Sequence, residues 1–209
     1  AAQASAQPGA VFLLHKGDYG AFAFEKSGAP GRYMVWKAAG DGEAILRQAK
    51  VSADHVWFEG LCLQRGEEAN GLVASGAPAD VVVVRNRFTG FHYSILLSRG
   101  SRDWYIADNV IVGDKDIENR GNDKQPLSGE GIELNHSGGH VVAYNSISRV
   151  ADGFSYPDRN VDVYGNDIFD VTDDAAEPDR GFANVRIWGN RMYNYGFSGL
   201  SFQPMKCEI

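Results

Sequence analysis

The chain has 209 residues, 44% of them hydrophobic, with 25 glycines and a formal net charge of −7 at pH 7. This length suits one domain or one elongated solenoid. The acidic balance argues against a nucleic-acid partner, which would need a basic stripe on the protein. No apolar run reaches the roughly 18 residues of a membrane-spanning helix, so no membrane span is expected.

Residues 1–54 form the least regular part of the sequence. Three short apolar runs, at 11–14, 21–24 and 33–36, fit strands of one or two opening coils. We therefore expect an N-terminal cap with irregular opening coils over 1–54, and regular coils over 55–204, within one domain spanning 1–209.

From residue 55 onward the chain repeats one pattern: a β-branched run, then Asn or Gly, an apolar residue, a turn and a short strand. The repeated cores occupy 56–61, 81–86, 104–109, 140–145, 161–166 and 185–190. Their asparagines recur at intervals of 23, 36, 21 and 24 residues. A repeat of this length that contains only strands and turns predicts a solenoid whose units must stack to bury their apolar sides.

The recurring asparagines (Asn86, Asn109, Asn145, Asn166 and Asn190) have a structural explanation. Asn tolerates a left-handed turn, and its amide can bond the Asn of the coil above or below. We expect an asparagine ladder with no catalytic role. Alternation within the same runs places residues such as Val83 and Ile106 inward, together with His140, which is expected to be a satisfied core histidine.

A second strand column follows each turn, at 71–74, 94–97, 131–134, 153–156, 175–178 and 199–202. Alternation predicts that Ile132, Phe154 and Tyr156 point inward, while Glu133 and Glu177 point outward. Short turns between parallel columns of strands predict an all-β, right-handed parallel β-helix of roughly seven to eight coils, each about 21–36 residues long.

The segments 161–168 and 185–192 carry a motif of the Val-x-Val-x-Gly-Asn-x-apolar type, with Ile187 in place of the second Val in the later segment. On these residues the chain resembles the right-handed parallel β-helix repeat proteins of the pectate-lyase-like superfamily, over about residues 55–204. The resemblance implies a polysaccharide as partner and a secreted or periplasmic location. It is less informative about activity, because one fold hosts many functions. The regular coils end near Phe202 without an evident cap, so we expect either a fragment or self-association at that end.

The outward face of the second strand column turns acidic in its later coils. Six acids gather there across three coils: Glu130, Glu133, Asp152, Asp173, Asp174 and Glu177. At the usual strand spacing, Asp152 and Asp174 would lie about 5 Å apart, and Glu133 and Glu177 about 10 Å apart. Stacked carboxylates repel one another, so a pKa should rise or a hard cation such as Ca²⁺ should bind, with Glu130 and Asp173 as expected ligands. The alternative is a set of acids that simply face solvent.

Basic, polar and aromatic residues lie beside this acidic face. We expect Arg99, Lys115, Tyr156, Asp158 and Arg159 to bind substrate. Lys115 comes from the insertion 113–129, which we expect to overhang the acidic face. His136 and Arg180 are candidate catalytic residues, because glycan lysis needs a base and a cation that neutralises the uronate.

Two classes of function remain open at this point. In the first, an enzyme cleaves a glycan along the acidic face, either as a lyase or as a glycoside hydrolase that uses two carboxylates from Asp152, Asp174, Glu133 and Glu177. In the second, the chain is a non-catalytic carbohydrate-binding or structural β-helix, of the adhesin or spike kind. Cys62 and Cys207 would lie about 29 Å apart, which is too far for a disulfide, so both are predicted to be free.

Overall fold

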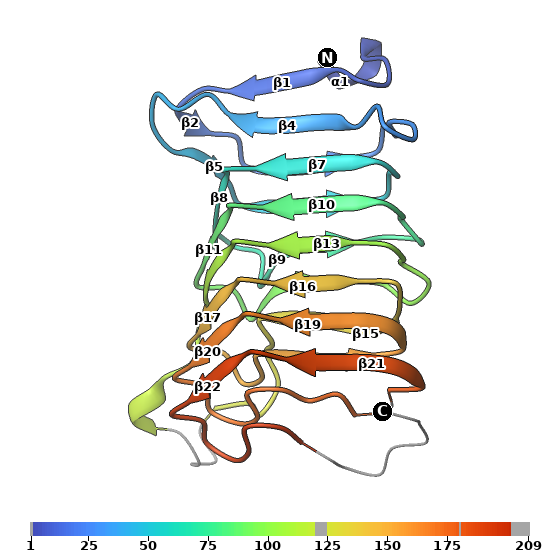
Figure 1. Ribbon diagram of the computed structural model, residues 1–209. Coiled ribbons are helices and arrows are strands. Elements are labelled where there is room, and N and C mark those ends of the chain that lie inside the picture. The colour runs from blue at the N-terminus through green and yellow to red at the C-terminus, as the bar shows by residue number, and fades with distance from the viewer. Residues whose placement is uncertain (1, 120–124, 180, 202–209) are drawn as a thin grey trace.

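The computed structural model describes residues 2–119, 125–179 and 181–201, and over them the chain winds into a parallel β-solenoid (Figure 1). Its strands form two sheets of eight strands and one sheet of six. Every strand pairs with its counterpart in the preceding or following coil, and the pairings between these strands are parallel, for example between β10 and β13. The predicted all-β parallel β-helix is confirmed.

The three sheets, named A, B and C here, run along the solenoid axis. Sheet A holds β1 (Val11–Leu14), β4 (Met34–Ala38), β7 (Val56–Glu59), β10 (Val81–Val84), β13 (Tyr105–Ala107), β16 (Val141–Ala143), β19 (Arg159–Tyr164) and β21 (Ala183–Trp188). Sheet B holds β2 (Gly17–Asp18), β5 (Ala44–Leu46), β8 (Cys62–Gln64), β11 (Arg87–Thr89), β14 (Val110–Val112), β17 (Ser146–Ser148), β20 (Asp167–Phe169) and β22 (Arg191–Tyr193). Sheet C holds β3 (Ala21–Phe24), β6 (Gln48–Val51), β9 (Asn70–Ala74), β12 (Tyr93–Leu96), β15 (Ile132–Ser137) and β18 (Phe154–Pro157).

Over residues 2–119, 125–179 and 181–201, helical structure is confined to two short segments, α1 (Ala2–Ser5) and the 3₁₀ turn η1 (Ile117–Asn119). Within the described residues, no helix has the length and apolar character needed to cross a membrane.

An asparagine ladder joins sheets A and B, as predicted. Each Asn side-chain amide donates to the Oδ1 of the next Asn, for example from Asn109 to Asn145 at 2.9 Å and from Asn145 to Asn166 at 3.0 Å. The same amide of Asn145 also donates to the backbone carbonyl of Ile106 in sheet A. The ladder satisfies polar groups that the turn would otherwise bury without partners.

The solenoid interior is one continuous apolar core to which all three sheets contribute. The inward positions predicted from alternation are buried, among them Val83, Ile106, Ile132 and Phe154, each at 0% exposure. His140 is 1% exposed, accepts the Trp104 backbone N–H at Nδ1, and lies 2.8 Å from the Ser137 hydroxyl at Nε2. It is therefore the satisfied core histidine that the alternation predicted.

The number of strands in each coil differs from the sequence prediction. The residues that follow each Asn, predicted only as an apolar residue before a turn, form the separate sheet B, and the predicted second column is sheet C. The sheet B strands are two or three residues long, too short to show an alternation in the sequence.

Two of the predicted strands of sheet C do not form as strands. At 175–178 the chain makes only an isolated bridge between Ser155 and Glu177, and 199–201 carries no strand. Pro178 offers no backbone N–H to a ladder, which explains why pairing stops there. Phe202 lies outside the described residues.

The opening part of the chain joins the same sheets as the later coils. The apolar runs predicted at 11–14, 21–24 and 33–36 correspond to β1, β3 and β4. Cys62 is a free thiol, as predicted, whereas Cys207 lies outside the described residues.

Candidate active site on the acidic face of sheet C

The outward column of sheet C changes from apolar to polar along the axis. Leu96 pairs with Glu133, Glu133 pairs with Ser155, and Ser155 bridges to Glu177 in the next coil. The register therefore stacks these positions in the order that the repeat predicted.

The six acids of this face, here called the acidic cluster, are Glu130, Glu133, Asp152, Asp173, Asp174 and Glu177. Four of them are nearly closed off from solvent: Glu130 is 4% exposed, Glu133 7%, Asp152 5% and Asp174 2%. Carboxylates are almost never this buried without a partner. The alternative of acids that simply face solvent is therefore wrong.

Three acids of the cluster could hold a metal ion together. Asp152, Asp173 and Asp174 each present a carboxylate oxygen, and these oxygens lie within 4.8 Å of one another. The Asp174 backbone N–H donates to Asp152 Oδ1 at 2.8 Å, and the Ser198 backbone N–H donates to Asp174 Oδ1 at 2.8 Å. These hydrogen bonds orient two of the three carboxylates, and an all-oxygen donor set suits a hard cation such as Ca²⁺.

This group matches the predicted metal ligands in part. Asp173 belongs to it, and the expected spacing of about 5 Å between Asp152 and Asp174 agrees with it. Within the described part of the chain Glu130 is not in the group, and its carboxylate instead accepts the Gly129 backbone N–H at 3.2 Å. A role for Glu130 as a ligand stays a prediction.

Burial and the mutual repulsion of the acids raise the pKa values of several members of the acidic cluster. Burial raises the pKa of Asp152 to about 9. The hydrogen bond from the Asp174 backbone lowers this pKa, whereas the charges of Glu177, Asp173 and Glu130 raise it. Burial, followed by the charge of Glu133, raises the pKa of Glu130 to about 7.

The pKa values of Glu177, Glu133 and Asp173 shift in the same direction. Burial and the charge of Asp179 raise the pKa of Glu177 to about 7, although a hydrogen bond from Tyr156 opposes the rise. Burial also raises the pKa of Glu133 and of Asp173. Near neutral pH the cluster must therefore hold protons or be neutralised by a cation.

Glu133 is held from two sides. The Ser155 hydroxyl donates to one carboxylate oxygen at 3.0 Å, and the Asn135 backbone N–H donates to the other at 3.0 Å. These bonds keep Glu133 in place at the start of an irregularity in β15.

His136 and Tyr156 lie next to each other at this irregularity. Their rings stack, with centroids 5.3 Å apart and an angle of 25° between planes, and both residues are half-buried. The inward position predicted for Tyr156 is wrong, because the bulge in β15 and a left-handed backbone at Tyr156 (φ 52°) turn its ring away from the core.

Three other residues predicted to bind substrate, Arg99, Asp158 and Arg159, lie beyond the ends of the sheet C strands β12 and β18. Arg159 donates to Asp158 at 2.9 Å, and its guanidinium lies 4.6 Å from the centroid of the Phe182 ring. Arg99 is exposed in the turn after β12. Arg180 lies outside the described residues, so its catalytic role stays a prediction.

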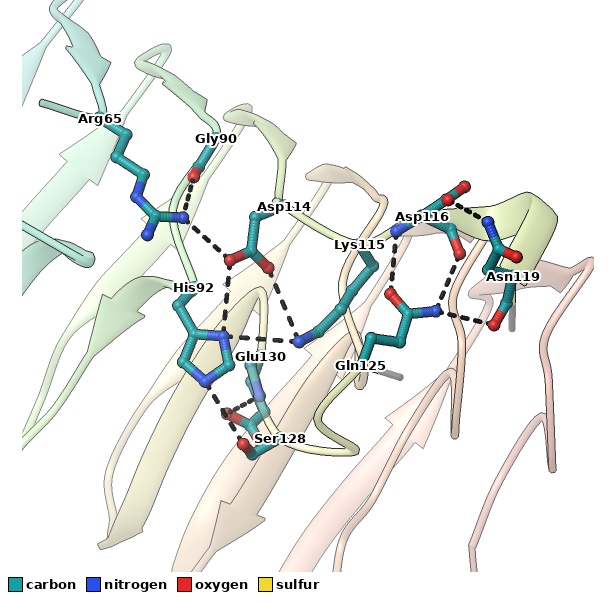
Figure 2. Close-up of polar contacts among 11 residues, drawn as sticks. Arg65, Gly90, His92, Asp114, Lys115, Asp116, Asn119, Gln125, Ser128 and Glu130 are labelled. Atoms are coloured by element: carbon teal, nitrogen blue, oxygen red, sulfur yellow. Dashed lines mark hydrogen bonds and ion pairs between the residues drawn. The ribbon is translucent and has the colours of Figure 1, made fainter. Parts of the chain in front are cut away.

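Lys115 is held in a polar network at the base of the insertion (Figure 2). Its side chain is 3% exposed, with Nζ 3.7 Å from Asp114 Oδ1 and 3.5 Å from His92 Nδ1, and Arg65 donates to the other oxygen of Asp114. Ser128, at the far end of the insertion, lies 3.3 Å from His92 Nε2. The network thus joins both ends of the insertion to His92, the residue before β12. Substrate binding by Lys115 stays a prediction.

Two residues beside the cluster were missed by the sequence analysis as site residues. Burial, with the charge of Lys115, lowers the pKa of His92 and so favours its neutral form. Burial, with the charge of Glu130, raises the pKa of Tyr93 to about 12. Tyr93 pairs in register with Asn70, and both residues directly precede the strands predicted at 94–97 and 71–74. Comparing the residues at this position in successive coils would have identified Tyr93.

Comparison with solved structures finds the crystal structure of pectate lyase Pel9A, with a TM-score of 0.66 and 16% sequence identity. The match covers 93% of this chain and 56% of that one, so the chain spans little more than half its length. No protein-family model matches the chain, and no curated protein does. At this identity the likeness concerns the fold. The protein is a parallel β-helix whose fold is similar to that of pectate lyase Pel9A.

Proposed function

We propose that the acidic cluster binds a divalent cation such as Ca²⁺, and that the protein uses it to bind and cleave an acidic, uronate-containing polysaccharide lying along sheet C. The observation that carries this proposal is the Asp152, Asp173 and Asp174 group, whose oxygens lie within 4.8 Å of one another. The likeness to a pectate lyase supports the substrate class. A polysaccharide substrate also supports an extracytoplasmic location.

A cation would remove the conflict between an acidic surface and an acidic glycan. The buried carboxylates would otherwise repel a uronate, whereas a bound cation would attract its carboxylate and make the neighbouring C–H more acidic. Glu177 and Glu133 then border the bound sugar.

Cleavage by β-elimination needs a proton acceptor near the cation. The base removes the proton next to the uronate carboxylate, a carbon–carbon double bond forms, and the glycosidic C–O bond breaks as its oxygen takes up a proton. His136 is a residue type suited to proton transfer near neutral pH, and Arg159, which begins β19 in sheet A, is a second candidate. Lys115 is the third candidate.

Glycoside hydrolysis is the second candidate reaction, favoured by the pKa of about 7 at Glu177. A hydrolase needs one carboxyl that stays protonated near neutral pH and a second that is ionised. A non-catalytic binding module is the remaining alternative.

The test combines cation binding with a panel of acidic and neutral polysaccharides. Calorimetry should detect Ca²⁺ binding, and ultraviolet absorbance should detect unsaturated products that depend on Ca²⁺. Asp152→Asn and Asp174→Asn should each weaken Ca²⁺ binding by about tenfold or more and abolish cleavage. Asp167→Asn is the matched control, because Asp167 is paired with Arg191 on sheet B and should leave both unchanged.

Each other outcome selects a different function. New reducing ends without unsaturated products would indicate a hydrolase, and binding without products would indicate a non-catalytic module. The proposal fails if the protein binds neither Ca²⁺ nor any acidic glycan.

A further inference from the structure

Strand β15 contains a bulge directly beside the acidic cluster. Glu133 pairs with Ser155 and Ser137 pairs with Pro157, so residues 134–136 lie opposite Tyr156 alone. A bulge of this kind re-aims side chains and is common next to active sites.

The bulge holds three residues in left-handed backbone conformations: Asn135 (φ 47°), His136 (φ 55°) and Tyr156 (φ 52°). Asn and His adopt this conformation more readily than most residues, whereas it is uncommon for a bulky side chain such as Tyr. Left-handed residues recur singly at other turns of the solenoid, as at Tyr144 (φ 57°), but here three of them face one another across the β15–β18 pairing.

This left-handed backbone is not explained by burial of the two rings. His136 and Tyr156 stack on each other, remain half-buried and do not belong to the apolar core. The ring pair therefore forms a side wall of the acidic face.

Two contacts connect the bulge with the acidic cluster, and Arg159 lies nearby at the start of β19. Tyr156 forms a side-chain hydrogen bond with Glu177, and the Asn135 backbone N–H holds Glu133. Arg159 packs over Gly138, two residues after His136, where a Cβ on the glycine would lie 3.2 Å from Arg159 Cγ. A ring pair beside a carboxylate cluster, with the guanidinium of Arg159 held nearby by Asp158, suits a uronate pyranose ring, which has an apolar C–H face, hydroxyls and a carboxylate.

We propose that His136 and Tyr156 form a sugar-binding subsite that takes a pyranose ring of the acidic glycan against the face of the ring pair, with Arg159 at its edge. This inference rests on the proposed function, because it assigns the subsite next to the proposed cation site.

The test replaces each ring by a residue that favours the same backbone. His136→Asn and Tyr156→Asn remove the rings while keeping a side chain that tolerates a left-handed φ. Melting temperatures should stay equal or rise, and calorimetric Ca²⁺ affinity should stay unchanged. The affinity for the acidic oligosaccharide that the wild type binds most tightly, measured on ice before turnover, should fall by about tenfold.

Tyr144→Asn is the matched control. Tyr144 has the same backbone conformation (φ 57°) and is 57% exposed, but it lies after β16 at the outer side of sheet A. Its replacement should leave oligosaccharide affinity unchanged. Tyr156→Phe keeps the ring without its hydroxyl and should retain most of the affinity if ring stacking is the main contact.

Two results would overturn the inference, and they differ in what they say about the proposed function. If the wild type binds Ca²⁺ and glycan but both Asn variants bind glycan equally well, the subsite is wrong and the proposed function stands. If the wild type binds neither, both proposals fail. If an Asn variant does not fold, His136→Phe and Tyr156→Phe replace the pair, and loss of affinity in both would also contradict ring stacking.

Discussion

Asp152 illustrates how the surroundings of one residue change its chemistry. It is 5% exposed, its Oδ1 accepts the Asp174 backbone N–H, and its pKa is raised to about 9 by burial and by neighbouring acids. An acid whose pKa is raised on folding binds more protons in the folded than in the unfolded state. A bound cation can replace those protons.

The first prediction concerns pH and Ca²⁺ together. In the presence of a chelator, the contribution of Asp152 to stability should be complete below its ordinary pKa of 3.8 and should be lost as pH rises toward about 9. Added Ca²⁺ should restore stability most strongly at the alkaline end, where the carboxylates are ionised. Chemical unfolding at a series of pH values, with and without Ca²⁺, measures both effects.

Asp152→Asn provides the comparison for that series, because an amide does not titrate. Its stability should depend less on pH and respond less to Ca²⁺. Equal pH profiles for the variant and the wild type would contradict the assigned pKa shift.

At the level of single residues, the sequence predicted which acids share a face but not how deeply they are buried. Asp152, Asp173 and Asp174 follow from the repeat register alone. The burial of Glu130 and Glu133 depends on the paths of the neighbouring chain segments, which no local pattern encodes.

At the level of elements, small residues directly before strands of sheet C, such as Gly131 and Gly153, allow the chain to pass close to sheet B. A Cβ added to Gly153 would lie 2.6 Å from Ile168 Cγ2 and closer still to the backbone oxygen of Ala175. Gly131 has the same relation to Ile147. Backbone atoms and inward-facing isoleucines cannot move aside easily in a packed interior.

A second prediction concerns the close approach of Gly153 to Ile168 and to the Ala175 backbone. Gly153→Ala should destabilise the protein by about 2 kcal/mol, as overpacking of a core typically does. It should also weaken Ca²⁺ binding, because Gly153 directly follows Asp152. Chemical unfolding and calorimetry measure the two effects.

Gly66→Ala serves as the control, because its added Cβ would meet only the flexible side chain of Arg47. It should change stability by less than about 0.5 kcal/mol. A Gly153→Ala protein as stable as Gly66→Ala would show that sheet C has room at this position.

Element boundaries were predicted where apolar alternation extends over four or more residues, as in β7 and β10. The strands of sheet B and the bulge in β15 were not predicted. A strand of three residues has no distinctive period, and a bulge is defined by the residues opposite it in another coil.

At the level of the whole molecule, each coil pairs only with the coils before and after it. The order of strands within each sheet follows the chain without a crossover, from β1 to β21 in sheet A. Stability in such an array is approximately a sum of coil and interface contributions. Among the described strands, those of the first and last coils pair on one side, whereas those of the central coils pair on two.

Hydrogen exchange of this chain should reflect that difference. Amides of β10, β13 and β16 should exchange most slowly, and those of β1 and β22 fastest, because local opening needs the loss of fewer interfaces at the ends. Mass spectrometry of peptides over a time course measures the gradient. Uniform protection across all coils would indicate that the solenoid opens as one unit.

The fold follows from the sequence because its repeat is local: the Asn column and the β-branched runs specify each coil, and identical coils can bury their apolar sides only by stacking. The acidic column on sheet C follows from the same register. The three-sheet cross-section, the burial of the acids and the ring pair at the bulge depend on contacts between residues about 20 or more positions apart. Those contacts exist only after the coils have stacked, so the tertiary structure alone places His136 and Tyr156 beside the acidic cluster.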